Sequence, residues 1–516
     1  MEILFGIDVG TSGCKVVAIN KHGEVVCSGS QTYPTLYPKP GWAEQNPEDW
    51  YKASCQAIQN CLVSGDINPG EVVALSVDGP AHNVALMNAD GSVIYPAIHW
   101  SDLRSVEQCE TLDSLYGDMI YKITHQQVNP SWTLAQLMWL KENEPVVWSK
   151  LRRIQVTKDY VRYRLAGDYL TDIYDATGTQ MYDVENDCWS EDISSILGYE
   201  VDWLPQVETA TSISGGLTSA AAKETGLLEG TPIAVGSGDS VVEAFGIGVV
   251  EPGQCIVKIA TAANVNLVHA QPHPSPMTIT YPHVIEGRWF SIAATNSGAS
   301  TIRWFRDTFC RHEKEQAETQ GVNIYQLIEE LSSDALPGCE GLLFHPYLMG
   351  ERTPYWDPLL RGDFVGISAR HTIHHFSRAI LEGVAYSIRD CFQVVEDLGQ
   401  QISEIRLIGG GTKSPLWRQI ISDVLGRPLL KPMIEDAAFG AALLSGVAVS
   451  LFPDWQSALN ASVKIEESLQ PDMDVHARYD EYFEVYRAIT RDMAEHSHQL
   501  TELASRESYS KTNIIE

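Results

Sequence analysis

The sequence predicts an α/β fold of two similarly built halves with a cleft between them. The main observation is a repeated pattern, in which a buried strand leads into a turn of small residues and threonine and then into a second strand. It occurs first over residues 3–19, where the turn is 10–13, and again over 254–268, where the turn is 261–263. A length of 516 residues is enough for about two to four domains, each with its own core.

The first half is predicted to begin with a β-meander over residues 3–29, because apolar runs alternate there with turns rich in Gly and Asn. A helix is expected to run to about Val63, since Asn46 is a typical helix cap and Pro47 fits the first helical position. Residues 72–77 are then predicted to form a buried strand.

In the second half, residues 404–408 are predicted to form a strand that enters the glycines 409–411. The apolar residues of 414–425 recur at helical spacing, which predicts a helix. The weakly polar run 437–452 is shorter than the roughly 18–20 residues that a membrane span needs, so it favours a buried helix.

A turn near residues 245–254 is the predicted domain boundary. We therefore expect an N-terminal domain over 1–247, a C-terminal domain over 248–480, and a C-terminal helix with a frayed tail over 481–516. No segment is rich enough in Pro, Gly or Ser to be a long linker, so any hinge between the domains is expected to be short.

Acidic residues far outnumber basic ones, with 67 Asp and Glu against 36 Lys and Arg and a formal charge of −31. Nucleic-acid phosphates and anionic membranes would repel such a chain, so we expect small-molecule partners, no nucleic acid and no membrane.

The ten cysteines form no CxxC pair and no Cys/His cluster with zinc spacing. No basic segment precedes the first apolar run, so we predict a cytoplasmic protein without a signal peptide. A homodimer is compatible with the sequence.

Two glycine-containing turns have the chemistry that phosphate binding requires. Asp8 ends a buried strand before the turn 10–13, whose amides and hydroxyls are able to face a phosphate and its Mg²⁺. The glycines 409–411 would let a nucleotide approach the backbone closely. Each has a simpler alternative: Asp8 could accept hydrogen bonds only from its own turn, and 409–411 could be an ordinary turn.

Three further motifs carry polar side chains suited to a sugar or its phosphorylation. Asp239 follows a glycine-rich turn and could accept a proton from an attacking hydroxyl, or it could simply cap the following helix. The segments 78–82 and 100–104 carry donors, acceptors and an aromatic face suited to a polyhydroxylated substrate. Considered separately, a structural role is the more common one for each of these two segments, because a lone His or Trp usually just packs.

The order of these motifs resembles the FGGY family of carbohydrate kinases over nearly the whole chain. The opening FGIDVGTSGCKVVAI is similar to the first phosphate motif of the family, and GERTPYWDPLLRGDFVGIS to a stretch typical of its sugar kinases. LIGGGTKSPLWRQIISDVLGRPL resembles the second family signature, and EDAAFGAALLSG the helix after it. TKDYVRYRLAGDYLTD, DATGTQMYDVENDCWS and GSGDSVVEAFG are most similar to xylulokinases within this family.

The resemblance implies two actin-like (ribonuclease H-like) domains flanking a central cleft, with sugar and catalytic base in the first and nucleotide in the second. It implies Asp239 as the catalytic base, Asp8 as the Mg²⁺ site, and ATP as the phosphoryl donor. The other residues that it assigns to binding are Thr11, Ser12 and Thr261 at the phosphates, Gly298, Gly410, Gly411 and Ser414 at the nucleotide, and Ala81, His82, Trp100 and Asp102 at the sugar.

The chain departs from the xylulokinase pattern mainly around the substrates. Pro80 and Ala81 stand before His82 where Gln-Met is common, Ser101 replaces an Asn, and Ala260 replaces the Gly before the phosphate-contacting Thr. We expect phosphorylation of D-xylulose to D-xylulose 5-phosphate, with ribulose, a ketohexose or a polyol of the glycerol or erythritol type as alternatives. A different alternative is an actin-like ATPase or sugar-binding regulator, which would have no need for a base at position 239.

Overall fold

The computed structural model describes residues 2–512 and divides into two compact units. The first unit contains residues 2–251, 270–290 and 434–464. The second unit contains residues 252–269, 291–433 and 465–512. The chain thus leaves the first unit and returns to it twice.

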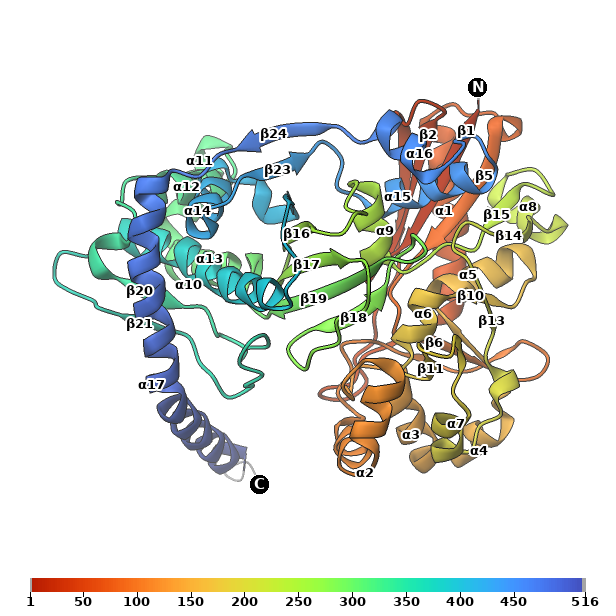
Figure 1. The fold of residues 1–516 in the computed structure, drawn as a ribbon, viewed down its shortest axis with the longest axis horizontal. Coiled ribbons are helices and arrows are strands. Elements are labelled where there is room, and N and C mark those ends of the chain that lie inside the picture. The colour runs from red at the N-terminus through yellow and green to blue at the C-terminus, as the bar shows by residue number, and fades with distance from the viewer. Residues whose placement is uncertain (1, 513–516) are drawn as a thin grey trace. The chain divides into compact units, whose positions relative to one another are not determined.

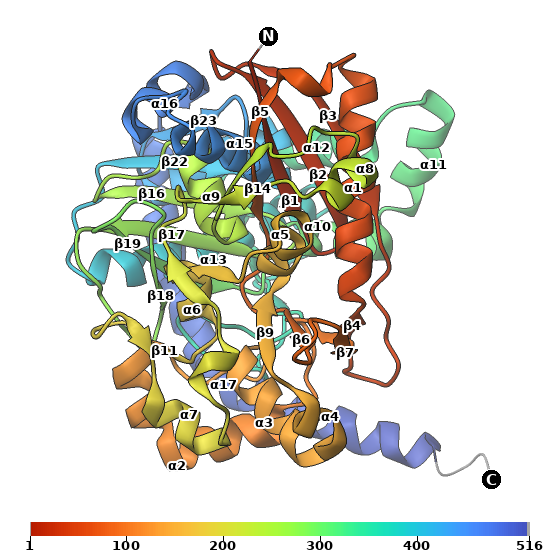
Figure 2. The same cartoon turned by 90° about the vertical axis from the view of Figure 1, so that its right-hand side faces the viewer.

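The first unit is built on a six-stranded mixed sheet in the order β14-β15-β5-β1-β2-β3 (Figure 1 and Figure 2). The strands β1, β2 and β3 form the predicted meander, while β5 and β15 run parallel to β1. The bounds of these strands are β1 Ile3–Val9, β2 Gly13–Asn20, β3 Val25–Thr32, β5 Val72–Asp78, β14 Ile213–Gly216 and β15 Pro232–Ala234.

Strand β1 is buried on both faces because helices cover the sheet on each side. Helices α1 (Pro47–Ser64) and α5 (Thr157–Ala166) lie on one face (Figure 2), and α9 (Asp239–Gly246) and α15 (Ala437–Ala448) on the other. Alternate residues of β1 meet opposite faces. The odd-numbered residues pack with α1 in one cluster, and Leu4 packs with α15 in another. Asp8 therefore points to the face that α9 and α15 cover.

The return of the chain as α15 differs from the sequence-based division, which placed residues 437–448 in the second domain. The helix is apolar on all sides and packs against β1 and α9 (Figure 1). Gly6 allows this contact, since a Cβ at this position would lie 1.8 Å from the carbonyl oxygen of Ala438. The close approach brings the first turn of α15 next to the end of β1.

The other elements of the first unit are shorter strands and further α-helices. Its strands are β4 Glu44–Gln45, β6 Val84–Met87, β7 Val93–Tyr95, β8 Ala97–Ile98, β9 Arg153–Val156, β10 Leu170–Asp172, β11 Tyr182–Asp183, β12 Cys188–Trp189, β13 Gln206–Glu208 and β18 Ile279–Pro282. Its helices are α2 Val106–Thr124, α3 Thr133–Asn143, α4 Pro145–Lys150, α6 Ile173–Gly178, α7 Glu191–Leu197, α8 Ser219–Thr225 and α16 Trp455–Ser462.

The second unit repeats the strand order of the first. Its main sheet contains β19-β17-β16-β22-β23-β24, in which β22 is parallel to β16 and β23 to β22, while β17 and β24 are antiparallel to their neighbours β16 and β23. The bounds of these strands are β16 Gln254–Ile259, β17 Ala263–His269, β19 Trp289–Thr295, β22 Glu404–Ile408, β23 Leu429–Pro432 and β24 Ile465–Leu469. The internal similarity predicted from the two strand-turn-strand patterns is therefore present in the sheets.

The core of the second unit forms around the long helix α13, which packs against β17 and α14 (Figure 1). The other elements of this unit are α10 Ala299–Phe309, α11 Arg311–Gln320, α12 Ile324–Ser333, β20 Leu343–His345, β21 Asp363–Val365, α13 Ile373–Asp397, α14 Pro415–Leu425 and α17 Met473–Thr512. The predicted frayed tail overlaps the end of α17, and its last residues, 513–516, lie outside the described part. Across residues 2–512, no helix combines the length and apolar character needed to cross a membrane.

Candidate active site

Three aspartates lie at or after the carboxyl ends of three strands in the first unit. Asp8 and Asp78 are paired directly in the parallel register of β1 and β5. The chain after β15 continues the pattern, since Gly238 pairs with Gly79 and the backbone N–H of Asp239 donates to the Gly79 carbonyl oxygen at 2.9 Å. Ligands of α/β sheets bind at the carboxyl ends of the strands. These aspartates therefore indicate where the chemistry takes place.

Asp78 is buried and Asp8 lies half-buried beside it, an arrangement that favours a proton or a cation between the two carboxyl groups. Burial raises the pKa of Asp8 to about 7, and the negative charges of Asp239 and Asp436 add to this effect. Burial, followed by the charge of Asp8, also raises the pKa of Asp78. Within residues 2–512, the buried oxygens of Asp78 have no hydrogen-bond partner apart from the carboxyl group of Asp8.

This pair of carboxyl groups fits a divalent cation, which would remove their repulsion and satisfy the oxygens of Asp78. Among the described residues, no group of three or more His, Cys, Asp or Glu side chains could hold a metal ion alone. Mg²⁺ keeps several water or phosphate ligands in proteins, so two carboxylates are a sufficient protein contribution.

Asp239 is the first residue of α9, and its side chain does not cap the helix. The N-cap is Gly238, and Oδ1 of Asp239 accepts hydrogen bonds from the N–H (2.6 Å) and the hydroxyl (3.1 Å) of Ser240. The other carboxylate oxygen, Oδ2, remains for a ligand. The geometry therefore favours the predicted base over the alternative of a capping residue.

An aromatic cluster next to Asp239 contains the predicted His82. The imidazole stacks on Trp132 with ring centroids 4.7 Å apart, and Tyr281 stacks on Tyr174 at 4.5 Å. Burial raises the pKa of both tyrosines, and the charge of Asp239 adds to the effect on each. Aromatic faces beside a carboxylate suit the apolar C–H face and the hydroxyls of a sugar.

The hydrogen bonds of His82 fix its tautomer. Nδ1 lies 2.9 Å from the carbonyl oxygen of Gly178, which only accepts, so Nδ1 carries the proton. Nε2 is then an acceptor, and the hydroxyl of Tyr281 lies 3.3 Å from it. Burial lowers the pKa of His82 to about 4, so the ring is neutral near pH 7. The imidazole thus offers one lone pair to a hydroxyl group.

The other residues predicted at the sugar lie in different environments. Ala81 is buried and packs near Gly178, where an added Cβ would lie 2.9 Å from the Ala81 Cβ. Trp100 is 42% exposed and is held by its backbone N–H, which donates to Asn83 Oδ1 at 2.7 Å. Trp100 therefore presents a ring that a ligand can reach.

Asp102 is buried, and protein donors occupy both of its carboxylate oxygens. It accepts hydrogen bonds from the N–H of Ala43 (2.6 Å) and from the guanidinium of Arg104 (2.7 and 2.9 Å). Arg104 also forms an ion pair with Glu44 at 2.8 Å and stacks on Trp42. In this arrangement the carboxylate orders the loop beneath Trp100.

The turn predicted to contact phosphate in the first unit is exposed at Thr11 and Ser12. It is closed by the hydrogen bond from Gly10 N–H to the Gly13 carbonyl oxygen at 3.0 Å. Lys15 follows on β2 and forms an ion pair with Asp436. Two hydroxyls and one cation therefore lie near the aspartate pair, as a phosphate group requires.

The second unit contains a cavity of about 550 Å³ that brings together segments far apart in the sequence. Four of the five residues predicted there line it: Thr261, Gly410, Gly411 and Ser414. The remaining walls include the rings of Tyr325 and Trp417, the aliphatic Ile302, Ile328 and Leu381, and the polar Arg303, Asn323 and Lys413. A volume of this size with an apolar wall and a polar end suits a nucleoside phosphate.

Glycine is required at two of the turns around this cavity by close backbone approach. A Cβ at Gly298 would lie 2.7 Å from the Ala260 carbonyl oxygen, and one at Gly409, where φ is +95°, 2.6 Å from that of Ile259. Gly410 has open space instead, so its backbone is accessible to a ligand. Ser414 caps α14 by accepting from the N–H of Trp417 at 3.1 Å.

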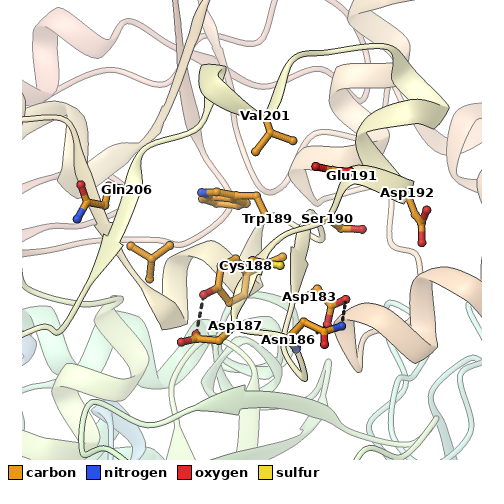
Figure 3. A pocket seen from close by; sticks show the side chains of 12 residues that line it. Asp183, Asn186, Asp187, Cys188, Trp189, Ser190, Glu191, Asp192, Val201 and Gln206 are labelled. Carbon is orange, nitrogen blue, oxygen red and sulfur yellow. Dashed lines mark hydrogen bonds between the residues drawn. The ribbon is translucent and has the colours of Figure 1, made fainter.

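A second, larger cavity in the first unit contains none of the predicted residues (Figure 3). It has a volume of about 720 Å³ and surrounds Trp189 with the acidic side chains Asp183, Asp187, Glu191 and Asp192. The carboxylates around this ring do not lie at the carboxyl ends of the strands of the main sheet, where Asp8, Asp78 and Asp239 are found. We therefore do not assign the reaction to this cavity.

Comparison with known families decides the assignment of the chain. The N-terminal domain of the FGGY family of carbohydrate kinases matches residues 3–246, and its C-terminal domain matches residues 257–449. The chain belongs to this family. It is an ATP-dependent carbohydrate kinase, and the predicted family and α/β fold are confirmed.

Individual relatives of this FGGY kinase agree with the assignment. A xylulose kinase of Staphylococcus epidermidis is 30% identical over 492 residues, covering 95% of this chain and 96% of the relative. A gluconokinase of Bacillus subtilis is 28% identical over 445 residues, 86% of each chain. The crystal structure of a "xyloylose kinase" from Brucella ovis has a TM-score of 0.87 at 28% identity, covering 95% of this chain and 99% of that one.

Sequence reasoning did not assign roles to Trp132, Tyr174 and Tyr281, and it grouped Asp78 with the sugar motif. Isolated aromatic residues are usually part of a core, so their spacing gives no signal. Asp78 did have a signal, because it ends a buried strand just as Asp8 does.

Replacing His82 with Ala is expected to raise the KM for sugar by roughly 10–100-fold, because it removes a hydrogen-bond acceptor and a ring stacked on Trp132. The dissociation constant of ATP, whose predicted residues in the second unit are unaffected, should stay within twofold of wild type. Steady-state kinetics and calorimetry measure the two quantities. An equal loss of both would mean that His82 supports the fold and not the sugar pocket.

Proposed function

We propose that this kinase transfers the γ-phosphate of ATP to a hydroxyl of D-xylulose, forming D-xylulose 5-phosphate. The observation that carries the proposal is the placement of Asp239, with an available carboxylate oxygen, beside the neutral imidazole of His82 and the aromatic cluster. The xylulose kinase relatives support the choice of sugar.

In this proposal Asp239 Oδ2 accepts the proton of the attacking hydroxyl, while its Oδ1 stays anchored to Ser240. Nε2 of His82 accepts a hydrogen bond from a second sugar hydroxyl, which takes the place of the Tyr281 hydroxyl on its single lone pair, and so orients the sugar. Asp8 and Asp78 would hold Mg²⁺, which neutralises the phosphate charge when bound. Thr11, Ser12 and Thr261 would contact the phosphates, and the cavity of the second unit would hold the nucleoside.

The experiment is ADP release by the purified protein with ATP and Mg²⁺, with and without a panel of acceptors. The panel contains D- and L-xylulose, D- and L-ribulose, D-fructose, D-tagatose, glycerol, erythritol, the pentitols and D-gluconate. We expect the largest kcat/KM with D-xylulose, and phosphorus NMR of the product should show a primary phosphate ester.

A larger kcat/KM for another acceptor would replace D-xylulose and leave the kinase chemistry intact. Gluconate is a useful member of the panel because it is anionic, whereas His82 is neutral and offers it no charge. Sugar-independent ATP hydrolysis without response to any acceptor would instead favour the actin-like ATPase or regulator.

A further inference from the structure

A buried network of charges lies beneath the segment that carries Asp239. Its centre is Lys158 of α5, whose side chain is fully buried. The ammonium Nζ lies 2.6 Å from Asp159 Oδ1, 3.1 Å from Asp172 Oδ1 and 3.0 Å from Asp175 Oδ2. A single cation thus joins three carboxylates that belong to α5, β10 and α6.

Arg162, one turn further along α5, is buried in the same network. Its guanidinium bonds Asp159 at 2.8 Å and Asp168 at 3.1 Å. It also donates to the carbonyl oxygen of Val235 at 2.7 Å. Val235 directly follows β15, so this hydrogen bond fixes the start of the turn that leads to Asp239.

The second connection to this turn passes through Asp172. Its Oδ1 faces Lys158, and its Oδ2 accepts the hydroxyl of Ser237 at 2.5 Å. The next residue, Gly238, is confined by the ring of Tyr174, because an added Cβ would lie 2.2 Å from a ring carbon. The two residues before Asp239 are therefore both held in place, Ser237 by its hydrogen bond to Asp172 and Gly238 by the ring of Tyr174.

The same network extends to the sugar side of the site through α6. Asp172 caps this helix by accepting the N–H of Tyr174 at 3.2 Å, and the last residue of the helix, Gly178, bonds Nδ1 of His82. One short helix therefore connects the position of the base with the position of the imidazole.

A contribution to folding stability does not by itself explain why this network consists of buried charges. Two fully buried cations face four carboxylates, of which only that of Asp168 is appreciably exposed, at 8%. Removing charges from water costs free energy that their attraction often only offsets. Burial raises the pKa of Asp175, which shows how strongly this environment disfavours a further negative charge. A purely apolar interior would support the sheet equally well, but it would provide no hydrogen bonds to Val235 and Ser237.

We infer that Lys158 and Arg162 are positioning residues, which hold Asp239 in register with the sugar through the Asp172–Ser237 and Val235 hydrogen bonds. The inference rests on the proposed role of Asp239 as the base. The side chains of α5 do not contact the reacting atoms. In this inference they affect turnover by holding the segment that carries Asp239.

The sharpest test is Ser237→Ala, because it removes one hydrogen bond and leaves both buried cations paired. Misplacing a catalytic group by about 1 Å can cost up to about 100-fold in rate, so we expect kcat to fall roughly 10–100-fold. The KM for sugar and the dissociation constant of ATP should stay within twofold, since His82 and the second unit keep their contacts. The measurements are steady-state kinetics with the best acceptor of the panel and calorimetry with ATP.

Ser54→Ala is the matched control. Ser54 is also fully buried in the first unit and donates one hydrogen bond, to the Trp50 carbonyl oxygen at 2.8 Å within α1. We expect a similar change in melting temperature for both variants, with kcat lowered only by Ser237→Ala. If both variants lose activity in proportion to their melting temperatures, the network has only a structural role and the inference is wrong.

A double-mutant cycle tests the connection itself. If Ser237 acts through Asp172, the effects of Ser237→Ala and Asp172→Asn on kcat should be strongly non-additive. Additive effects, or a wild-type kcat for Ser237→Ala, would overturn the inference. Asp239→Asn is measured in parallel. If this variant retains turnover, the proposed base is wrong. If Asp239→Asn is inactive but Ser237→Ala is fully active, only the positioning role is contradicted.

Discussion

Replacing Asp239 with Asn is expected to lower kcat by about 10²–10⁴-fold, the range typical for loss of a general base. The carboxamide keeps the shape of the side chain and can still accept from Ser240, but it cannot take the proton of the sugar hydroxyl. Binding of ATP and sugar should remain close to wild type. Single-turnover kinetics with the best acceptor, together with calorimetry for each substrate, measure the two effects.

Asp192→Asn is the appropriate control for this variant. Asp192 also lies in the first turn of a helix of the first unit, α7, but it is exposed and lines the cavity around Trp189, which contains none of the predicted site residues. It should therefore retain wild-type turnover. A turnover of Asp239→Asn within a few-fold of the control would show that the base is another residue.

Asp8→Asn is expected to abolish most activity and to stabilise the metal-free protein at the same time. Loss of a carboxylate ligand weakens Mg²⁺ binding, so we expect kcat/KM to fall by about 10²-fold or more. Because burial raises the pKa of Asp8 from 3.8 to about 7, the folded state holds a proton in a range where the unfolded state has released it. The free energy of unfolding then decreases with pH between these values, by up to about 1.4 kcal/mol per pH unit.

The Asn side chain removes this dependence, so Asp8→Asn should be more stable than wild type at pH 8, on the order of 1–4 kcal/mol. Mg²⁺ alone should raise the melting temperature of wild type at pH 8 and much less at pH 5, where Asp8 is protonated. Thermal unfolding between pH 5 and 8, with and without Mg²⁺, measures both effects. The exposed Asp90→Asn should behave as wild type. A Mg²⁺ response in Asp8→Asn equal to that of wild type would contradict the role of Asp8.

The local elements of both units could be predicted because each rests on a local pattern. The meander, the helix capped by Asn46 and the strand 404–408 depend on alternation, turn residues and caps within a few positions. The partner of an apolar helix is not a local property, so the packing of α15 on β1 could not be predicted from its own sequence.

In the candidate site, too, the residues marked by a local sequence pattern could be predicted, and those brought in by tertiary packing could not. Asp8, Asp239 and the glycines 409–411 stand at strand ends, where a turn pattern marks them. Tyr281 and Trp132 meet His82 only through tertiary packing, and single aromatic residues resemble any core residue in the sequence. The occupied oxygens of Asp102 likewise depend on Arg104 being buried beside it, which the motif alone does not indicate.

The return of α15 to the first unit has a consequence for biosynthesis. Leu4, Ile19 and Phe245 are buried against this helix, yet they leave the ribosome long before it does. Translation from residue 251 to residue 434 takes roughly 10–40 s at usual ribosomal rates. Throughout that interval the nascent N-terminal sheet lacks α15, one of the two helices that cover this face, so apolar surface stays exposed there, which makes the nascent chain a natural client for a chaperone.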